Sequence, residues 1–155
     1  SMYSQQISLA KGGMEMPQLK AYDLFISHAW TYSADYYHLV DLINAAPYFK
    51  WRNYSVPRHD PVIDPNTDAG RKVLIRELDQ QIRPVNCVII IAGMYVAYRY
   101  WIQKEIEIAQ SYRKPIIGII LRGQQRTPGA VQDAAAEMVR WTTTSIVDAI
   151  RRHSL

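Results

Sequence analysis

The chain has 155 residues, the size of one ordinary domain, and it is 48% hydrophobic and 21% charged, as soluble globular proteins are. It has one cysteine, Cys87, and four histidines without finger-like spacing, which excludes a disulfide scaffold and a zinc ribbon. The net charge of +4 is spread over single basic residues and pairs, so we interpret it as a mixed solvated surface and expect no nucleic-acid binding.

Residues 1–20 show no periodicity, and we expect a flexible N-terminal arm before a single domain at 21–155. This segment lacks the basic patch and apolar stretch of a secretory signal. The longest uncharged run, around residues 87–98, is shorter than the roughly 20 apolar residues that cross a bilayer. We therefore expect a cytoplasmic protein that contacts no membrane, in a reducing setting that suits a lone cysteine.

The first strand is expected at 21–27, and the helix after it begins at Ser33 and ends before Pro47. A short strand at 51–56 and a Pro- and Asp-rich loop at 57–66 follow. The apolar residues of this first helix have the spacing of one buried face: Tyr36, Leu39, Val40 and Ile43.

The second helix begins at Thr67 or Asp68 and ends before Pro84. Residues 86–92 are almost entirely apolar, which is typical of a parallel strand covered on both faces. A third helix is expected at about 99–112. The buried stripe of the second helix consists of Leu74, Leu78 and Ile82.

Residues 115–121 repeat the buried-strand pattern, and a short helix at 127–136 follows. A small edge strand at 138–141 precedes a final helix, which Thr144 caps and which ends near Arg152. Strand and helix thus alternate five times. This order predicts an α/β, flavodoxin-like fold, with a five-stranded parallel sheet in the order 2-1-3-4-5 and helices on both faces.

Open parallel sheets bind ligands at the carboxyl ends of the strands, where the strand order reverses. Here that point lies between the first and third strands, so residues 27–30 and 93–95 are presented there. The loop that contains His59 and Asp60 can fold over the same opening. Dinucleotide-binding, P-loop and hydrolase sites are excluded, because the chain has no GxGxxG, GxxxxGKS, GxxxxGKT or GxSxG motif.

One carboxylate is well placed near this edge. At about 100° per residue, Glu105 lies at the margin of the buried face of its helix, whereas Glu107 lies on the solvent side. Trp101 is one turn before Glu105 and leans to the same side. Spacing alone leaves two interpretations open: a site built on this indole and carboxylate, or a surface glutamate paired with Lys104 or Arg99. The stripe that faces the sheet consists of Ile102, Ile106 and Ala109.

Residues 22–28 (Tyr-Asp-Leu-Phe-Ile-Ser-His) resemble the opening strand of TIR domains, and residues 101–106 (Trp-Ile-Gln-Lys-Glu-Ile) resemble their Trp-Cys-x-x-Glu helix. The similarity covers about residues 21–150. Three further segments resemble one branch, the bacterial TIR-like proteins of the Thoeris antiphage system, the ThsB family: 51–61, 82–84 and 92–95.

The resemblance implies an NAD⁺ nucleosidase (NADase) or ADP-ribosyl cyclase of antiphage defence, with NAD⁺ as substrate and with no cofactor or metal. Glu105 matches the essential glutamate of enzymatic TIR domains, and Ile102 stands where many of them have cysteine, which weakens any role for a thiol. By the same resemblance, a phage-derived trigger would activate the enzyme, with assembly into a homo-oligomer. Its ADP-ribose-derived signal would then reach a separate effector protein.

The chemistry suits one carboxylate, because breaking the nicotinamide–ribose bond develops positive charge on the sugar while nicotinamide leaves neutral. Trp30 and Trp101 offer aromatic faces to the cationic ring, and the backbone N–H groups of 27–30 would hold phosphate. The expected substrate-binding residues, beside the catalytic Glu105, are Ser27, His28, Trp30, His59, Asp60, Tyr95 and Trp101.

Some of these residues have an alternative interpretation. His28 touches phosphate or ribose, or else it hydrogen-bonds a loop carbonyl. His59 and Asp60 line a lid, or else they stabilise a turn before Pro61. The tyrosines stack adenine or form a self-association surface, although we expect most of them to pack: Tyr32, Tyr36, Tyr37, Tyr54, Tyr95, Tyr98 and Tyr100.

Two rival functions remain. The aromatic and basic surface suits a TIR interaction module that assembles without catalysis. The fold class and a glutamate directed at a ribosyl carbon also suit an enzyme similar to nucleoside deoxyribosyltransferases.

Overall fold

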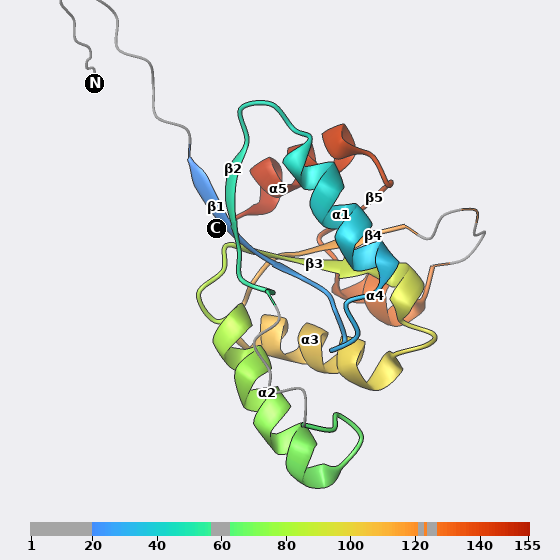
Figure 1. Ribbon diagram of the computed structural model, residues 1–155. Helices are drawn as coiled ribbons and strands as arrows, with labels where there is room; N and C mark the ends of the chain where they lie inside the picture. The colour runs from blue at the N-terminus through green and yellow to red at the C-terminus, as the bar shows by residue number, and fades with distance from the viewer. Residues whose placement is uncertain (1–19, 57–62, 121–122, 124–126) are drawn as a thin grey trace, which may run out of the picture.

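The five predicted strands form one parallel sheet in the order β2-β1-β3-β4-β5 (Figure 1), which confirms the flavodoxin-like α/β fold. The computed structural model describes residues 20–56, 63–120, 123 and 127–155. The strands are β1 (Ala21–Ile26), β2 (Lys50–Asn53), β3 (Cys87–Ile91), β4 (Ile116–Ile119) and β5 (Glu137–Val139). The predicted arm at 1–20 lies, except for Lys20, outside the described residues.

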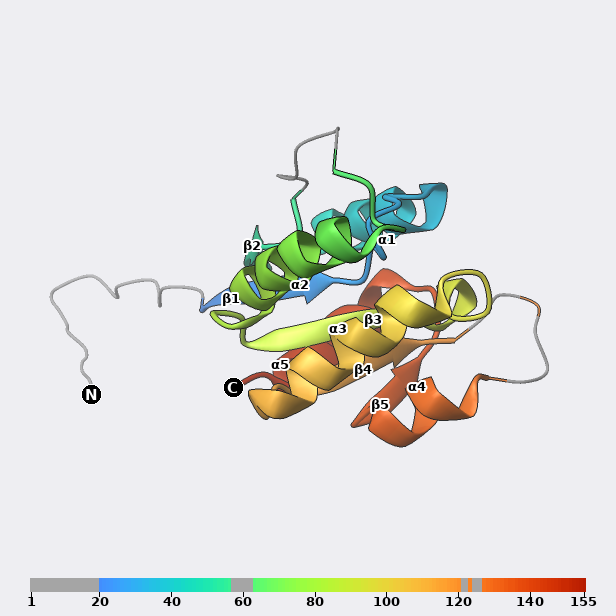
Figure 2. The ribbon, with the colours of Figure 1, turned by 90° about the horizontal axis from the view of Figure 1, so that it is seen from below.

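Helices cover both faces of the sheet, as right-handed crossovers between parallel strands require. The helices α1 (Ala34–Asn44) and α5 (Thr143–His153) contact each other on one face (Figures 1 and 2). The other face carries α2 (Asp68–Ile82), α3 (Arg99–Ser111) and α4 (Gly129–Ala134), and a short 3₁₀ turn, η2 (Ala92–Met94), follows β3. Within the described ranges, no helix is long and apolar enough to cross a membrane.

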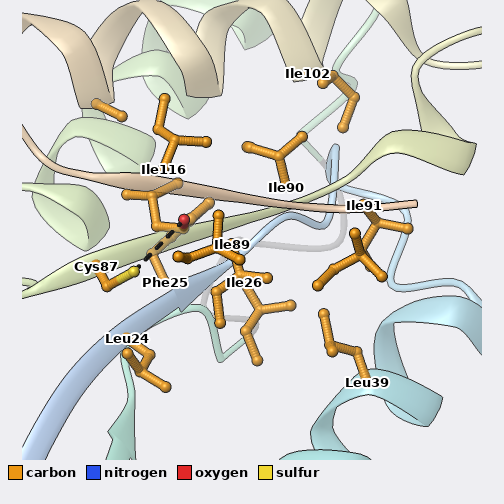
Figure 3. Packing of buried hydrophobic residues seen from close by; sticks show 14 of the residues in the cluster. Leu24, Phe25, Ile26, Leu39, Cys87, Ile89, Ile90, Ile91, Ile102 and Ile116 are labelled. Carbon is orange, nitrogen blue, oxygen red and sulfur yellow. Dashed lines mark hydrogen bonds between the residues drawn. The ribbon is translucent and has the colours of Figure 1, made fainter. Parts of the chain in front are cut away.

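The centre of the core is β3, in which all five residues are fully buried, as the apolar run predicts. Figure 3 shows Ile90 pointing to the side of Ile102 of α3, whereas Ile89 points to the opposite side, where Leu39 of α1 lies. Cys87 lies in the same strand, and burial raises the pKa of its thiol to about 12. It is therefore an unreactive core residue.

The second strand is shorter than predicted, because β2 ends at Asn53 rather than near Val56. The amide of Ser55 donates to the Asn53 side chain at 2.9 Å, which turns the backbone out of the sheet. Ser55 is fully buried, and its carbonyl accepts hydrogen bonds from Tyr32 Oη at 2.9 Å and Tyr36 Oη at 3.4 Å. The strand therefore ends because a polar network captures its last residues.

The cap of the last helix is Thr142 rather than the predicted Thr144. The Thr142 hydroxyl accepts from the amide of Ser145 at 3.2 Å, and α5 begins at Thr143, whose own hydroxyl donates to the carbonyl of Leu42. Three consecutive threonines carry equivalent hydroxyls, so the sequence could not distinguish the cap among them.

Replacement of Thr142 by Ala should lower the free energy of unfolding by about 1 kcal/mol, because the Ser145 amide loses its acceptor. Thr144→Ala is the matched control, since Thr144 is exposed within the helix, where Ala has the higher helix propensity. Urea denaturation of both variants measures the difference. A larger loss for Thr144→Ala would contradict this assignment.

Candidate active site

The loop after β1, the turn η2 and the first turn of α3 meet at the carboxyl edge of the sheet (Figure 1). Because β1 pairs with both β2 and β3, the strand order reverses at this place, as predicted. Four of the predicted substrate-binding residues lie on this loop and on α3, and all four are buried: Ser27, His28, Trp30 and Trp101.

Glu105 lies inside the protein, not at the margin that its position on the helix predicts. Its exposed fraction is 0%, and it shares the buried face of α3 with Ile102 and Ile106. The alternative of a surface glutamate paired with Lys104 is wrong for this residue. Lys104 Nζ instead lies 3.4 Å from the carboxylate of Glu107, which is half exposed.

The carboxylate of Glu105 is bound to the loop after β1. Its Oε2 accepts hydrogen bonds from the backbone amides of His28 at 3.1 Å and Ala29 at 2.9 Å. The other oxygen, Oε1, is buried and has no hydrogen-bond partner among the described residues, and the same holds for the Ser27 hydroxyl. One carboxylate oxygen is therefore anchored while the other retains its capacity to accept.

The predicted phosphate-binding role of the amides at 27–30 is wrong for this structure. The Ser27 amide donates to the carbonyl of Ile89 at 2.8 Å, and the Trp30 amide donates to His28 Nδ1 at 2.9 Å. The amides of His28 and Ala29, which lie between these two in the chain, donate to Glu105. The anion that this loop holds is thus a side chain of the protein itself.

The loop adopts a strained backbone to make these bonds. Ala29, Trp30 and Tyr32 have φ angles of 52°, 57° and 50°, in the left-handed region that costs a non-glycine residue roughly 1 kcal/mol or more. Such strain persists only where the surroundings impose it. Here the bonds to Glu105 and to the His28 ring impose it.

Burial raises the pKa of Glu105 to about 7, from an ordinary value of 4.5. The hydrogen bonds from the amides of Ala29 and His28 act in the opposite direction, because they favour the ionised form. The ionised and protonated forms are therefore both populated near neutral pH. Perturbation of this kind is typical of a functional carboxylate.

His28 contacts protein groups through both ring nitrogens. Its Nδ1 accepts from the Trp30 amide, and its Nε2 lies 2.9 Å from Oε1 of Gln81 on α2. Sequence analysis missed Gln81, because nothing in the spacing of two residues 53 positions apart indicates their contact. The ring also stacks on Tyr32, with centroids 4.6 Å apart.

The two predicted indoles are buried and contact each other. Trp30 and Trp101 are 8% and 6% exposed, and their rings meet edge to face at 6.3 Å. Tyr95 is half-buried, with the Arg99 guanidinium 5.6 Å from its ring. Of the other predicted tyrosines, Tyr36 is buried and Tyr32 and Tyr54 are partly buried, whereas three are exposed: Tyr37, Tyr98 and Tyr100.

His59 and Asp60, the predicted lid residues, lie outside the described residues. Within the part of the chain that the structure describes, no three His, Cys, Asp or Glu side chains gather so that they could hold a metal ion. The site therefore consists of one buried carboxylate, two indoles and a loop of occupied amides.

Comparison with known families identifies one family. The family model described as "Thoeris protein ThsB, TIR-like domain" matches residues 25–126, which is about two thirds of the chain and includes the end of β1, the loop after it and all of α3. No curated protein matches the chain.

The raised pKa of Glu105 predicts a loss of stability as the pH rises. Between pH 4.5 and about 7 the folded state keeps the proton that the unfolded state releases, so the free energy of unfolding falls over this range. One pH unit per proton is worth about 1.4 kcal/mol, which makes the total loss roughly 3 kcal/mol. Glu105→Gln has no proton to release and should lack this loss.

Urea denaturation of the wild type and Glu105→Gln between pH 5 and 8 measures the effect. We expect the variant to gain stability relative to the wild type as the pH rises. A difference that does not change with pH would contradict the assignment, and Glu107→Gln, at an exposed position of the same helix, serves as control.

Proposed function

Because the chain belongs to the family of Thoeris ThsB TIR-like domains, we propose that it is an enzyme that cleaves NAD⁺, with Glu105 as its catalytic residue. The observation that carries this proposal is the state of the Glu105 carboxylate. It is fully buried, two amides anchor one oxygen, and the other oxygen has no partner among the described residues.

The reaction breaks the bond between the anomeric carbon of ribose and the nicotinamide nitrogen. The electron pair of that bond goes to the nitrogen, so nicotinamide leaves neutral and the ribose gains oxocarbenium character. The ionised Glu105 would stabilise this positive charge, and in a site without water the stabilisation is large. Attack by water would complete hydrolysis to ADP-ribose, and attack by a group of the same molecule would form a cyclic isomer.

Substrate access requires a change in the loop after β1. Glu105 is fully buried, and the amides of His28 and Ala29 are bound to it. We propose that a phage-derived trigger, together with assembly of several copies of the chain, moves this loop. The product would be an ADP-ribose-derived signal that activates a separate effector protein.

The same burial favours a second candidate, an interaction module that assembles without catalysis. A carboxylate that is 0% exposed contacts no substrate in this conformation. In this alternative Glu105 has only a structural role: its bonds to His28 and Ala29 fix the loop after β1 in the shape that a partner recognises.

Glu105→Gln should lower nicotinamide release from NAD⁺ by roughly 10³-fold, since an amide cannot supply the negative charge that stabilises the ribosyl cation. Glu107→Gln should release nicotinamide as the wild type does, because its carboxylate lies on the solvent side of α3. Purified protein is incubated with NAD⁺, with and without an extract of phage-infected cells.

Undiminished release by Glu105→Gln would rule out this mechanism. Stable oligomers without nicotinamide release under either condition would favour the interaction module. Turnover of deoxynucleosides in preference to NAD⁺ would instead favour a deoxyribosyltransferase.

A further inference from the structure

We propose that Gln81 is a positioning residue for Glu105, and that it acts through the imidazole of His28. This inference rests on the proposed catalytic role of Glu105. Gln81 lies near the end of α2, where its side chain contacts His28 and Val56.

The orientation of the Gln81 amide is fixed by two hydrogen bonds. The side chain is only 7% exposed, and its nitrogen, Nε2, donates to the carbonyl of Val56 at 3.3 Å. Because a carbonyl only accepts, the amide nitrogen must face Val56, and the amide oxygen must face His28. Gln81 therefore joins the segment after β2 to the loop after β1.

The Gln81 oxygen in turn fixes the protonation of the His28 ring. At 2.9 Å the oxygen accepts a proton that Nε2 carries, while Nδ1 must have a free electron pair to accept from the Trp30 amide at 2.9 Å. Both contacts require the neutral ring with its proton on Nε2. A proton on Nδ1 would point at the N–H of Trp30, and the hydrogen bond between them would be lost.

This neutral ring leaves Glu105 without a counter-charge. His28 Nδ1 lies 3.9 Å from Glu105 Oε2, a distance at which an imidazolium would form an ion pair. Such a pair would lower the pKa of Glu105 and would neutralise the charge that the ribosyl cation needs. Gln81 thus keeps the carboxylate available for the reaction.

On the described elements around His28, no other group supplies a positive counter-charge to Glu105. Tyr32 stacks on the ring, and Tyr36 of α1 meets Tyr32 edge to face. Burial raises the pKa of Tyr32 above its ordinary value, so this hydroxyl stays neutral. From α2 the ring faces the uncharged Gln81, and from α3 it faces Glu105 itself.

Two substitutions of Gln81 separate its charge effect from its hydrogen bonds. In Gln81→Glu, a carboxylate beside Nε2 favours the imidazolium, which pairs with Glu105. We expect kcat to fall about 10- to 100-fold with little change in KM, as is usual for partners that orient a reacting side chain. Activity requires ionised Glu105, and the imidazolium lowers the pKa of this carboxylate. The increase of activity with pH should therefore occur at lower pH in Gln81→Glu than in the wild type.

Gln81→Met removes both hydrogen bonds without adding a charge. It should lower kcat similarly, because the ring no longer has a fixed tautomer, but it should not shift the rise in activity to lower pH. Gln80→Glu adds the same charge at the preceding, exposed position of α2 and should keep both the wild-type kcat and the wild-type pH profile.

Nitrogen-15 NMR of histidine-labelled wild type at pH 8 tests the tautomer without any substrate. A neutral ring protonated at Nε2 supports the proposal, and an imidazolium or an Nδ1–H tautomer overturns it. A wild-type pH profile and kcat in both Gln81 variants would overturn it as well.

If the wild type releases no nicotinamide, the proposed function fails separately, and carbon-13 NMR of the Glu105 carboxyl tests the coupling. A lower titration midpoint in Gln81→Glu than in Gln80→Glu supports the action of Gln81 on Glu105. Equal midpoints overturn it.

Discussion

The candidate site depends on two hydrogen bonds, which run from the amides of His28 and Ala29 to one oxygen of Glu105. A buried carboxylate is costly unless its hydrogen-bonding capacity is met. These amides meet half of that capacity, and in doing so they hold the loop after β1 in a left-handed conformation and attach it to α3. Burial, which these hydrogen bonds offset only in part, raises the pKa of the carboxylate to about 7 from 4.5.

The same two bonds give the site opposite properties. They anchor Glu105 beside Trp101 in a defined position, which a reacting carboxylate requires, and they also close the loop over it. Functional sites often contain strain and incompletely satisfied polar groups that the rest of the fold tolerates. A closed, strained loop over an acid that titrates near neutral pH is therefore well suited to regulation by movement of the loop.

Much of this arrangement could be predicted from local pattern. The apolar run at 86–92 identified the central strand, and the helical stripe of Ile102 and Ile106 placed Glu105 at the margin of the buried face of α3. The full burial of Glu105 could not be predicted, because a helical wheel gives a direction but not what covers it. The left-handed loop was missed because Ala29 and Trp30 carry no glycine signal, and the Gln81 contact because it joins distant segments.

The most direct test is the ionisation of Glu105 itself in the wild-type protein. Carbon-13 NMR of the labelled carboxyl group, assigned with Glu105→Gln, follows its chemical shift as the pH is raised. We predict a midpoint near 7, as burial against two amide donors requires. A midpoint near 4.5, the ordinary value of a solvated glutamate, would contradict the account.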